Sequence, residues 1–347
     1  MRLLIAGGGT GGHLYPALAV AHAFRAEEPD GALLLVGRKG GPEERLVPDA
    51  GFDLATVNVR GLDRDAPWKN LALPAIVPMA LRSGLAIVDR FRPDVVLGMG
   101  GYVMAPAVAA ARMRKIPYVL HEKDVRPGLA TRFFAGGAAV VCTTLPGTEA
   151  RLSARRVELT GVPLRDGFAP RTPNVPPRRL LITGGSQGAR HINEAVWGAL
   201  DQLLQRLEEV VHVAGRQGAE GVALHARPGY RGLAFADDMP ALMGEADLVV
   251  SRAGVGTIAE SSAVGLPMLL IPGTFGGGHQ EENAKAMVDA GAAVRIADGE
   301  LNPETLVATL DSLTPERLRA MARAASVLGR RDAAKRVLAV LHEVAGR

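Results

Sequence analysis

The stretch LLIAGGGTGGHLYPALAVA, residues 3–21, decides the fold class of this chain. A short apolar run ends at a turn of five glycines and one threonine, and an apolar, alanine-rich stretch follows the turn. This order predicts a strand, a tight turn and the start of a helix, because glycine allows close approach of the backbone to another group. The same order returns in LLITGGSQGAR, residues 180–190. We therefore expect two similar halves, each with a glycine turn suited to a phosphorylated ligand.

Short runs of Val, Ile and Leu alternate with helical patterns through both halves. In the first half they are RLLIAGG, ALLLVG, DVVLGMGG, PYVLHE and AAVVCTT, and in the second RRLLITGG, EVVHVAG, LAFAD, ADLVVSRAG and PMLLIPG. Parallel strands that helices cover on both faces require such nearly continuous apolar runs. The pattern predicts an α/β protein with doubly wound parallel sheets.

The proline-rich segment FAPRTPNVPPRR, residues 168–179, interrupts the pattern and is typical of a linker. We expect a first domain over 1–163 and a second over 164–330. The tail 331–347 forms a last helix that Asp332 could cap, and it carries an apolar stripe that must be buried, which we expect to cross back to the first domain. The stripe consists of Val337, Val340, Leu341 and Val344.

The composition argues against several classes of protein. The 40 Lys and Arg residues against 36 Asp and Glu give a dispersed net charge of +4, which does not predict a nucleic-acid partner. The single cysteine, Cys142, excludes an internal disulfide and is expected to be a buried structural thiol. We find neither a signal peptide nor an apolar stretch of the roughly 20 residues that span a bilayer, so we expect a cytoplasmic protein.

The first glycine turn matches a dinucleotide-binding motif only in part. Gly7, Gly9 and Gly12 satisfy G-x-G-x-x-G, but that fingerprint also needs an acidic residue at the end of the second strand. ALLLVGRKGG offers Arg38 and Lys39 there and no acid. An NADP-linked oxidoreductase that uses Arg38 stays open as an alternative.

Three further glycine turns favour a larger ligand, or two phosphorylated ligands that meet. They are GMGGY at 98–102, TGGSQGAR at 183–190 and SRAGVGTIAE at 251–260. A single dinucleotide would leave the turns of the second half without a ligand.

Seven motifs together resemble one family over essentially the whole chain. GGTGGHLYPALA, GMGGYV, HEKD, GGSQGAR, DDM, AGVGTIAE…GLP and HQEENA follow the order and spacing of the MurG family. The resemblance implies a GT-B fold, with two Rossmann-like domains, a cleft between them and a C-terminal helix that crosses back. A UDP-sugar epimerase on a similar architecture is the second alternative.

The activity that the resemblance implies is an inverting transfer of N-acetylglucosamine. The donor would be UDP-N-acetylglucosamine and the acceptor undecaprenyl-pyrophosphoryl-N-acetylmuramyl-pentapeptide, so that lipid I becomes lipid II. This step belongs to peptidoglycan synthesis and cell wall biogenesis, and thereby to cell shape and cell division. The resemblance implies neither a cofactor nor a metal, so we expect the DRD at 63–65 to be a solvated loop.

The resemblance also implies roles for individual residues. His13 would be the base that activates the acceptor hydroxyl, since histidine titrates near neutral pH, unless it only caps the helix or orients the loop. Glu122 would be a second catalytic group or would only orient loops. The residues implied at the donor are Thr10, Gly11, Gly12, Asp124, Arg165, Ser186, Ala236, Val255, Gly256, Thr257, Ile258, Ala259, Glu260 and Gln280. Those implied at the acceptor diphosphate are Gly98, Gly100, Gly101 and Tyr102.

The chain departs from the family pattern near these residues. The usual HEQN reads HEKD at 121–124, and an ionised Asp124 can accept but cannot donate a hydrogen bond. We expect Lys123 or another cation to offset the charge of Asp124, or the contact with the donor sugar to differ. Val162 and Met104 also replace residues that are polar or small in the family.

The segment 60–92 is the expected contact with an anionic membrane that holds the acceptor. Its six cations and three aspartates give a net charge of +3, and Trp68 could lie at the level of the lipid headgroups. The apolar residues of this segment could instead form the core-facing side of an ordinary amphipathic helix. The resemblance therefore implies a peripheral protein at the cytoplasmic face of the cell membrane.

Overall fold

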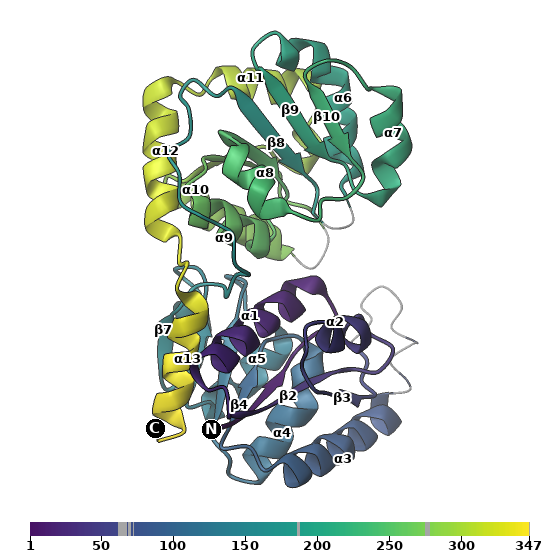
Figure 1. Ribbon diagram of the computed structural model, residues 1–347, viewed down its shortest axis with the longest axis vertical. Helices are drawn as coiled ribbons and strands as arrows, with labels where there is room; N and C mark the ends of the chain where they lie inside the picture. The colour runs from purple at the N-terminus through teal and green to yellow at the C-terminus, as the bar shows by residue number, and fades with distance from the viewer. Residues whose placement is uncertain (62–67, 69–70, 72, 186–187, 275–277, 347) are drawn as a thin grey trace. The chain divides into compact units, whose positions relative to one another are not determined.

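The computed structural model describes residues 1–61, 68, 71, 73–185, 188–274 and 278–346. The chain divides into two compact units, Met1–Arg165 with Asp332–Arg347, and Asp166–Arg331 (Figure 1). These limits lie two residues and one residue from the boundaries expected at 163 and 330. Each unit is described below by itself.

The first unit is built on a parallel sheet of seven strands in the order β3-β2-β1-β4-β5-β6-β7. Its strands are β1 Arg2–Ala6, β2 Ala32–Arg38, β3 Leu54–Val57, β4 Val95–Gly98, β5 Tyr118–Glu122, β6 Val140–Thr143 and β7 Val157–Leu159. Its α-helices are α1 Gly11–Glu27, α2 Glu43–Asp49, α3 Leu73–Phe91, α4 Ala105–Met113, α5 Leu129–Phe134 and α13 Ala333–Val344.

Helices cover both faces of this sheet (Figure 1). Leu3 and Ile5 of β1 face one core, which α1, α2 and α13 close. Leu4 and Ala6, which point the other way because side chains alternate along a strand, face a second core with α4. Cys142 is buried in the first core, as predicted, and burial raises the pKa of its thiol to about 12.

The C-terminal helix α13 packs on α1 of the first unit (Figure 1), which confirms the prediction that the tail crosses back. Val337, Val340 and Leu341 are buried there. Asp332 does stand at the N-cap position, but its side chain makes no capping hydrogen bond and accepts instead from Arg336 Nε at 2.7 Å.

The second unit is built on a parallel sheet of six strands in the order β10-β9-β8-β11-β12-β13. Its strands are β8 Arg179–Thr183, β9 Glu209–Val213, β10 Tyr230–Leu233, β11 Leu248–Ser251, β12 Met268–Leu270 and β13 Ala293–Arg295. Its α-helices are α6 Arg190–Leu204, α7 Ala219–Leu224, α8 Met239–Glu245, α9 Val255–Val264, α10 His279–Asp289, α11 Pro303–Asp311 and α12 Pro315–Leu328.

Both sheets reverse their strand order at a corresponding place. In the first the reversal lies between β1 and β4, and in the second between β8 and β11. Ligands of open α/β sheets bind outside the carboxyl ends of the strands at such a switch point. The glycine turns after β1, β4, β8 and β11 all stand at these ends.

The predicted linker lies within the second unit and is held by one buried carboxylate. Asp247, which precedes β11, accepts hydrogen bonds from the backbone N–H groups of Asn174, Arg178 and Arg179 at 2.8, 3.0 and 3.1 Å. The Arg171 guanidinium adds a bond of 2.7 Å. Burial opposes ionisation of Asp247, but these donors hold its pKa below the usual value.

Candidate active site

In the first unit the turns after β1 and β4 pack directly on each other. A Cβ atom added to Gly7 would lie 2.6 Å from the Cβ of Met99, a distance that no real side chain tolerates. The hydroxyl of Tyr102 lies 3.4 Å from where a Cβ of Gly9 would stand. Gly7 and Gly9 of the first turn are therefore explained in part by the close approach of the second turn, which leaves little room for side chains there.

His13 lies against the glycines of the second turn. A Cβ at Gly100 would lie 3.3 Å from Nε2 of His13, and one at Gly101 would lie 3.4 Å from its Cε1. The other ring nitrogen, Nδ1, is 3.1 Å from Oγ1 of Thr10. The structure thus brings together His13, Thr10, Gly100 and Gly101, which the sequence had assigned to donor, acceptor and catalysis.

Gly98 has a different environment. It is the last residue of β4, and a Cβ there would lie 2.7 Å from Sδ of Met104 and 2.9 Å from a methyl group of Leu120. Met104 is fully buried, and its sulfur accepts from the Gly100 N–H at 3.3 Å. Gly98 is therefore required for packing, because any side chain there would collide with the buried Met104 beneath the turn.

His13 is neutral at physiological pH. Burial, and then the nearby Lys123 cation, lower its pKa to about 3, although Asp124 acts in the opposite direction. A neutral imidazole can accept a proton, which a general base requires, but this pKa is far below the near-neutral value expected from the sequence and makes His13 a weaker base than an ordinary histidine.

Lys123 and Asp124 form an ion pair beside this histidine. The ammonium Nζ of Lys123 donates to Oδ2 of Asp124 at 2.6 Å, and only 19% and 16% of the two side chains are exposed. Cε of Lys123 would lie 3.7 Å from a Cβ at Gly12. Lys123 thus offsets the charge of Asp124, which is one of the alternatives that the sequence left open, and a different contact with the donor sugar stays a prediction.

Glu122 ends β5 with a buried carboxylate. Its Oε1 accepts from the backbone N–H of Asp124 at 3.2 Å, and its Oε2 accepts from that of Gly128 at 3.0 Å. Burial raises the pKa of Glu122, and these N–H donors partly counteract it. The contacts favour the interpretation in which Glu122 orients the loop after β5.

The analysis of motifs missed Glu43, the first residue of α2. Its side chain is fully buried, and its Oε1 accepts a hydrogen bond from the Gly9 N–H. One feature of the sequence could have drawn attention to Glu43: the second strand has no acidic residue at its end, where the dinucleotide fingerprint expects one. The acid comes five residues after β2 ends, and the fold returns it to the first glycine turn.

In the second unit the turns after β8, β11 and β12 share one edge, because these strands are neighbours. α6 and α9 begin there, directly after the N-cap residues Ala189 and Gly254, and neither N-cap residue makes a side-chain capping hydrogen bond. Uncapped backbone N–H groups at a helix start are donors for phosphate oxygens. Ser186, in the first of these turns, lies outside the described residues.

The predicted donor residues of α9 divide into two sets. Val255 and Ile258 are buried in the core, so only their backbone could reach a ligand. The others, which are partly exposed, are Gly256, Thr257, Ala259 and Glu260.

The remaining predicted donor residues come from other segments. Oε1 of Gln280, in the first turn of α10, accepts from the Gly273 N–H at 2.9 Å and so ties α10 to the turn after β12. Ala236 follows β10. Arg165, which the sequence placed in the second domain, ends the first of the two segments that form the first unit.

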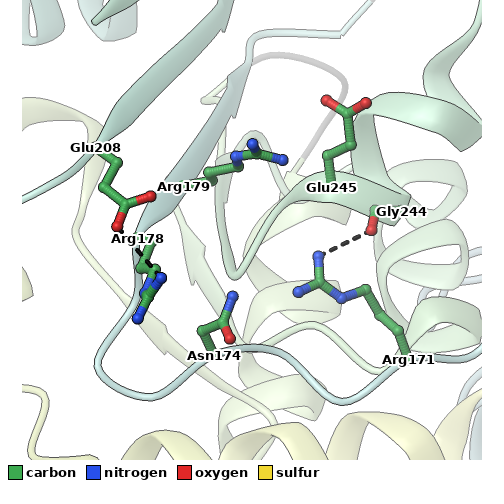
Figure 2. A pocket seen from close by; sticks show the side chains of 7 residues that line it. All are labelled: Arg171, Asn174, Arg178, Arg179, Glu208, Gly244 and Glu245. Atoms are coloured by element: carbon green, nitrogen blue, oxygen red, sulfur yellow. Dashed lines mark hydrogen bonds and ion pairs between the residues drawn. The ribbon is translucent and has the colours of Figure 1, made fainter.

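A cavity of about 390 Å³ in the second unit lies elsewhere (Figure 2). Arg178 and Arg179, which line it, stand at the amino end of β8, opposite the glycine turns. The guanidinium of Arg171 is occupied by the carbonyls of Gly244 and Ala246, at 2.8 and 2.7 Å. Because its arginines are paired within the protein, this cavity is not the candidate site.

Comparisons with known proteins agree with this arrangement. The glycosyltransferase family 28 N-terminal domain matches residues 3–143, and the glycosyltransferase family 28 C-terminal domain matches residues 179–337. A protein from a Nocardioides species is 38% identical over 99% of this chain and 98% of its own length. A protein from Syntrophotalea carbinolica is 39% identical over 100% of this chain and 99% of its own length. Both are named UDP-N-acetylglucosamine--N-acetylmuramyl-(pentapeptide) pyrophosphoryl-undecaprenol N-acetylglucosamine transferase.

Solved structures show the same relationship. The crystal structure of Acinetobacter baumannii MurG is similar with a TM-score of 0.79 and 29% identity, over 99% of both chains. The calicheamicin glycosyltransferase CalG4, at 18% identity and a TM-score of 0.70 over 99% of this chain and 98% of its own, shares the fold. This chain has the GT-B fold and belongs to the MurG family of glycosyltransferases.

Proposed function

We propose that this protein transfers N-acetylglucosamine from UDP-N-acetylglucosamine to undecaprenyl-pyrophosphoryl-N-acetylmuramyl-pentapeptide. The observation that carries the proposal is the identity of 38–39% with transferases of that name over essentially the whole chain. The arrangement of His13, Thr10 and two glycine turns in the first unit supports it. Through lipid II the reaction would serve peptidoglycan synthesis, and with it cell shape and division.

The two units would hold different substrates. The turns after β1 and β4 in the first unit would receive the acceptor, with the backbone of Gly100 and Gly101 and the hydroxyl of Tyr102 near its diphosphate. Within the first of these turns, Thr10, Gly11 and Gly12 would lie beside the donor. The second unit would hold UDP through the N-termini of α6 and α9. Glu260 would accept hydrogen bonds from the ribose, and Gln280 would contact the sugar.

His13 would act as the general base. It would take the proton from the acceptor hydroxyl, whose oxygen then attacks C1 of N-acetylglucosamine from the face opposite UDP. The bond between C1 and the UDP oxygen breaks, and the configuration at C1 inverts. If Nδ1 of His13 donates to Oγ1 of Thr10, Nε2 keeps the lone pair that accepts the proton. Arg165 and the helix N-termini would stabilise the charge that gathers on departing UDP.

The test of this function is turnover with radiolabelled donor and a lipid-linked muramyl acceptor. Replacement of His13 by Ala should lower kcat by about 10²–10⁴ without loss of UDP binding. His22→Ala is the matched control, because His22 lies on the same helix and is exposed, with its ring edge-on to that of Phe52 at 4.8 Å between centroids. Full turnover of His13→Ala would remove His13 as the base.

The alternatives can be separated by ligand binding. A thermal-shift measurement with UDP-N-acetylglucosamine or NADPH distinguishes a transferase from an oxidoreductase, since a bound ligand stabilises the folded state. An epimerase would convert the donor without any lipid acceptor. The hydrogen bond from Gly9 to Glu43 already occupies one amide that a dinucleotide would use.

Membrane contact through the segment 60–92 is part of the proposal. Ala80, Gly84 and Val88 are the buried residues of α3, spaced four apart on the side that packs on α4. Other apolar side chains of the segment are largely exposed: Trp68 68%, Leu71 82%, Val77 58% and Met79 62%. The segment thus contains a packed helix face and an exposed apolar surface, and Arg82, Arg90 and Arg92 are exposed nearby.

Among the described helices, none is long and apolar enough to cross a membrane. The exposed apolar residues and cations of segment 60–92 support peripheral attachment, which we propose to be at the cytoplasmic face. Arg64 and Lys69, which the sequence also assigned to this surface, lie outside the described residues, as does the DRD at 63–65.

The membrane surface can be tested with vesicles of phosphatidylglycerol and phosphatidylcholine. The double replacement of Val77 and Met79 by Asn should release the protein, because apolar area and cations together give the attachment. Leu224→Asn is the control, since Leu224 is 76% exposed but lies in α7 of the second unit. Equal vesicle binding by the double variant and the wild type would contradict the assignment.

A further inference from the structure

The carboxylate of Glu43 occupies a position that the sequence suggested for a ligand. Backbone N–H groups of a glycine turn are donors for phosphate oxygens. Here the N–H of Gly9 donates to Oε1 of Glu43 instead. The protein therefore satisfies this donor with a carboxyl oxygen of its own, carried by the first turn of α2.

Three glycines from different segments make room for this side chain. A Cβ at Gly37, in β2, would lie 2.7 Å from the Cβ of Glu43. A Cβ at Gly8 would collide with Oε1, and one at Gly41 would collide with Oε2. Close packing by the turn after β1, by β2 and by the loop before α2 restricts where the carboxylate can lie.

Burial of this group is unfavourable for the stability of the fold. No hydrogen-bond partner for Oε2 is found among the described residues. A buried polar oxygen without a partner destabilises a protein, and an apolar side chain of similar volume would avoid that penalty. The hydrogen bond to Gly9 therefore explains Glu43 better than a contribution to stability does.

Gly9 is held on its other side by the turn after β4. Its φ of +81° lies in the region that favours glycine, and a Cβ there would be 3.3 Å from a methyl group of Val103. Thr10 follows directly in the chain and contacts the His13 ring. A shift of Gly9 would consequently move the residue that orients the proposed base.

We propose that Glu43 is a positioning residue, whose carboxylate holds the first glycine turn so that Thr10 stays in place against His13. The inference rests on the proposed glycosyl transfer and adds a residue to it. Glu43 itself touches no substrate and takes no proton in this proposal.

Two substitutions of similar size separate the hydrogen bond from the charge. Glu43→Gln keeps an oxygen that can accept from Gly9 but removes the charge. Glu43→Asp keeps the charge but is shorter by one methylene, so its oxygens no longer reach Gly9 from the same backbone. Glu44→Ala is the matched control, because Glu44 is the exposed neighbour and accepts from Gly40 N–H at 2.9 Å.

The measurements are kcat of sugar transfer and the Kd of UDP by titration calorimetry. We expect kcat of Glu43→Gln within about threefold of wild type and that of Glu43→Asp lower by at least about tenfold, since misplacement by an ångström can cost about a hundredfold. The Kd of UDP should stay within about twofold in all variants, because the contacts proposed to hold UDP through the N-termini of α6 and α9 do not involve Glu43.

Two results would overturn the inference. One is wild-type kcat in Glu43→Asp. The other is a loss in Glu43→Gln as large as that in Glu43→Asp, because Gln keeps an oxygen that can accept from Gly9, and the hydrogen bond would then not be what sets the rate. Failure of the proposed function would look different, because the wild-type protein would then bind UDP or another ligand without transferring the sugar.

Discussion

The low pKa of His13 leads to a pH dependence unlike that of an ordinary histidine. Between pH 4.5 and 8 the diphosphates of both substrates stay ionised, so kcat/KM reports groups of the free enzyme. With an ordinary pKa of 6.5, about 3% of His13 would be neutral at pH 5. With the pKa of about 3 that burial and Lys123 produce, about 99% is neutral at pH 5. The two cases differ about thirtyfold in the expected kcat/KM at pH 5 relative to pH 7.5.

The assay is the initial rate of sugar transfer at subsaturating concentrations of both substrates. Short incubations are needed at low pH, with circular dichroism as the check that the protein remains folded. The perturbing variant is Lys123→Met, which removes the cation beside the imidazole and keeps the length of the side chain. The pKa of His13 should rise in this variant, so that kcat/KM begins to fall at a higher pH than in the wild type.

The opposite results would refute this reasoning. A wild-type profile that falls with a midpoint near 6.5, in protein that is still folded, would show that His13 is neither desolvated nor opposed by Lys123. A Lys123→Met profile that moves toward lower pH would show that the cation does not act on the ring. His13→Ala provides the baseline, since its residual rate should lack this dependence.

Three other predictions concern stability and the ion pair. His212 is fully buried and its pKa is lowered to about 4, mainly by burial, so the unfolded chain takes up the proton first as the pH falls. The stabilising contribution of neutral His212 is complete above pH 6.5, and the free energy of unfolding should fall by about 2 kcal/mol at pH 5. In urea unfolding, His212→Gln should show a smaller fall. Asp247→Ala leaves several buried donors without an acceptor and should lower the free energy of unfolding by about 3–5 kcal/mol, whereas exposed Asp201→Ala should change it by less than about 1 kcal/mol. Asp124→Asn alone removes the ion-pair partner of Lys123 and should lower kcat/KM. In a double-mutant cycle, the variant that combines Asp124→Asn with Lys123→Gln should recover part of that loss.

The central strands of both sheets could be predicted from the sequence, while strands at the edges could not. The apolar runs at 3–6, 95–98 and 248–251 are strands with a neighbour on each side. β3, β7 and β13 were missed, because an edge strand is covered less completely and its sequence is not a continuous apolar run. LAFAD was placed a few residues too late, since β10, also at an edge, is Tyr230–Leu233.

The candidate site was only partly predictable for a related reason. Glycine turns are local, so the sequence located Gly9, Gly100 and Gly188 and indicated that a phosphate ligand was involved. That Lys123 pairs with Asp124 was one of several alternatives, and the ion pair became visible only in the tertiary structure. The pKa of His13 depends on which groups surround the ring, and no spacing in the chain contains that information.

What the sequence determined by itself is the class of fold, the positions of the turns and the family, because each follows from local patterns and their order. Only the tertiary structure revealed that Glu43, which is 34 residues from Gly9 in the chain, holds the amide of that glycine. A contact of this kind depends on how β2 and α2 pack beside β1. The energy of a buried carboxylate depends on all the groups around it, so its role became visible only when those groups were in place.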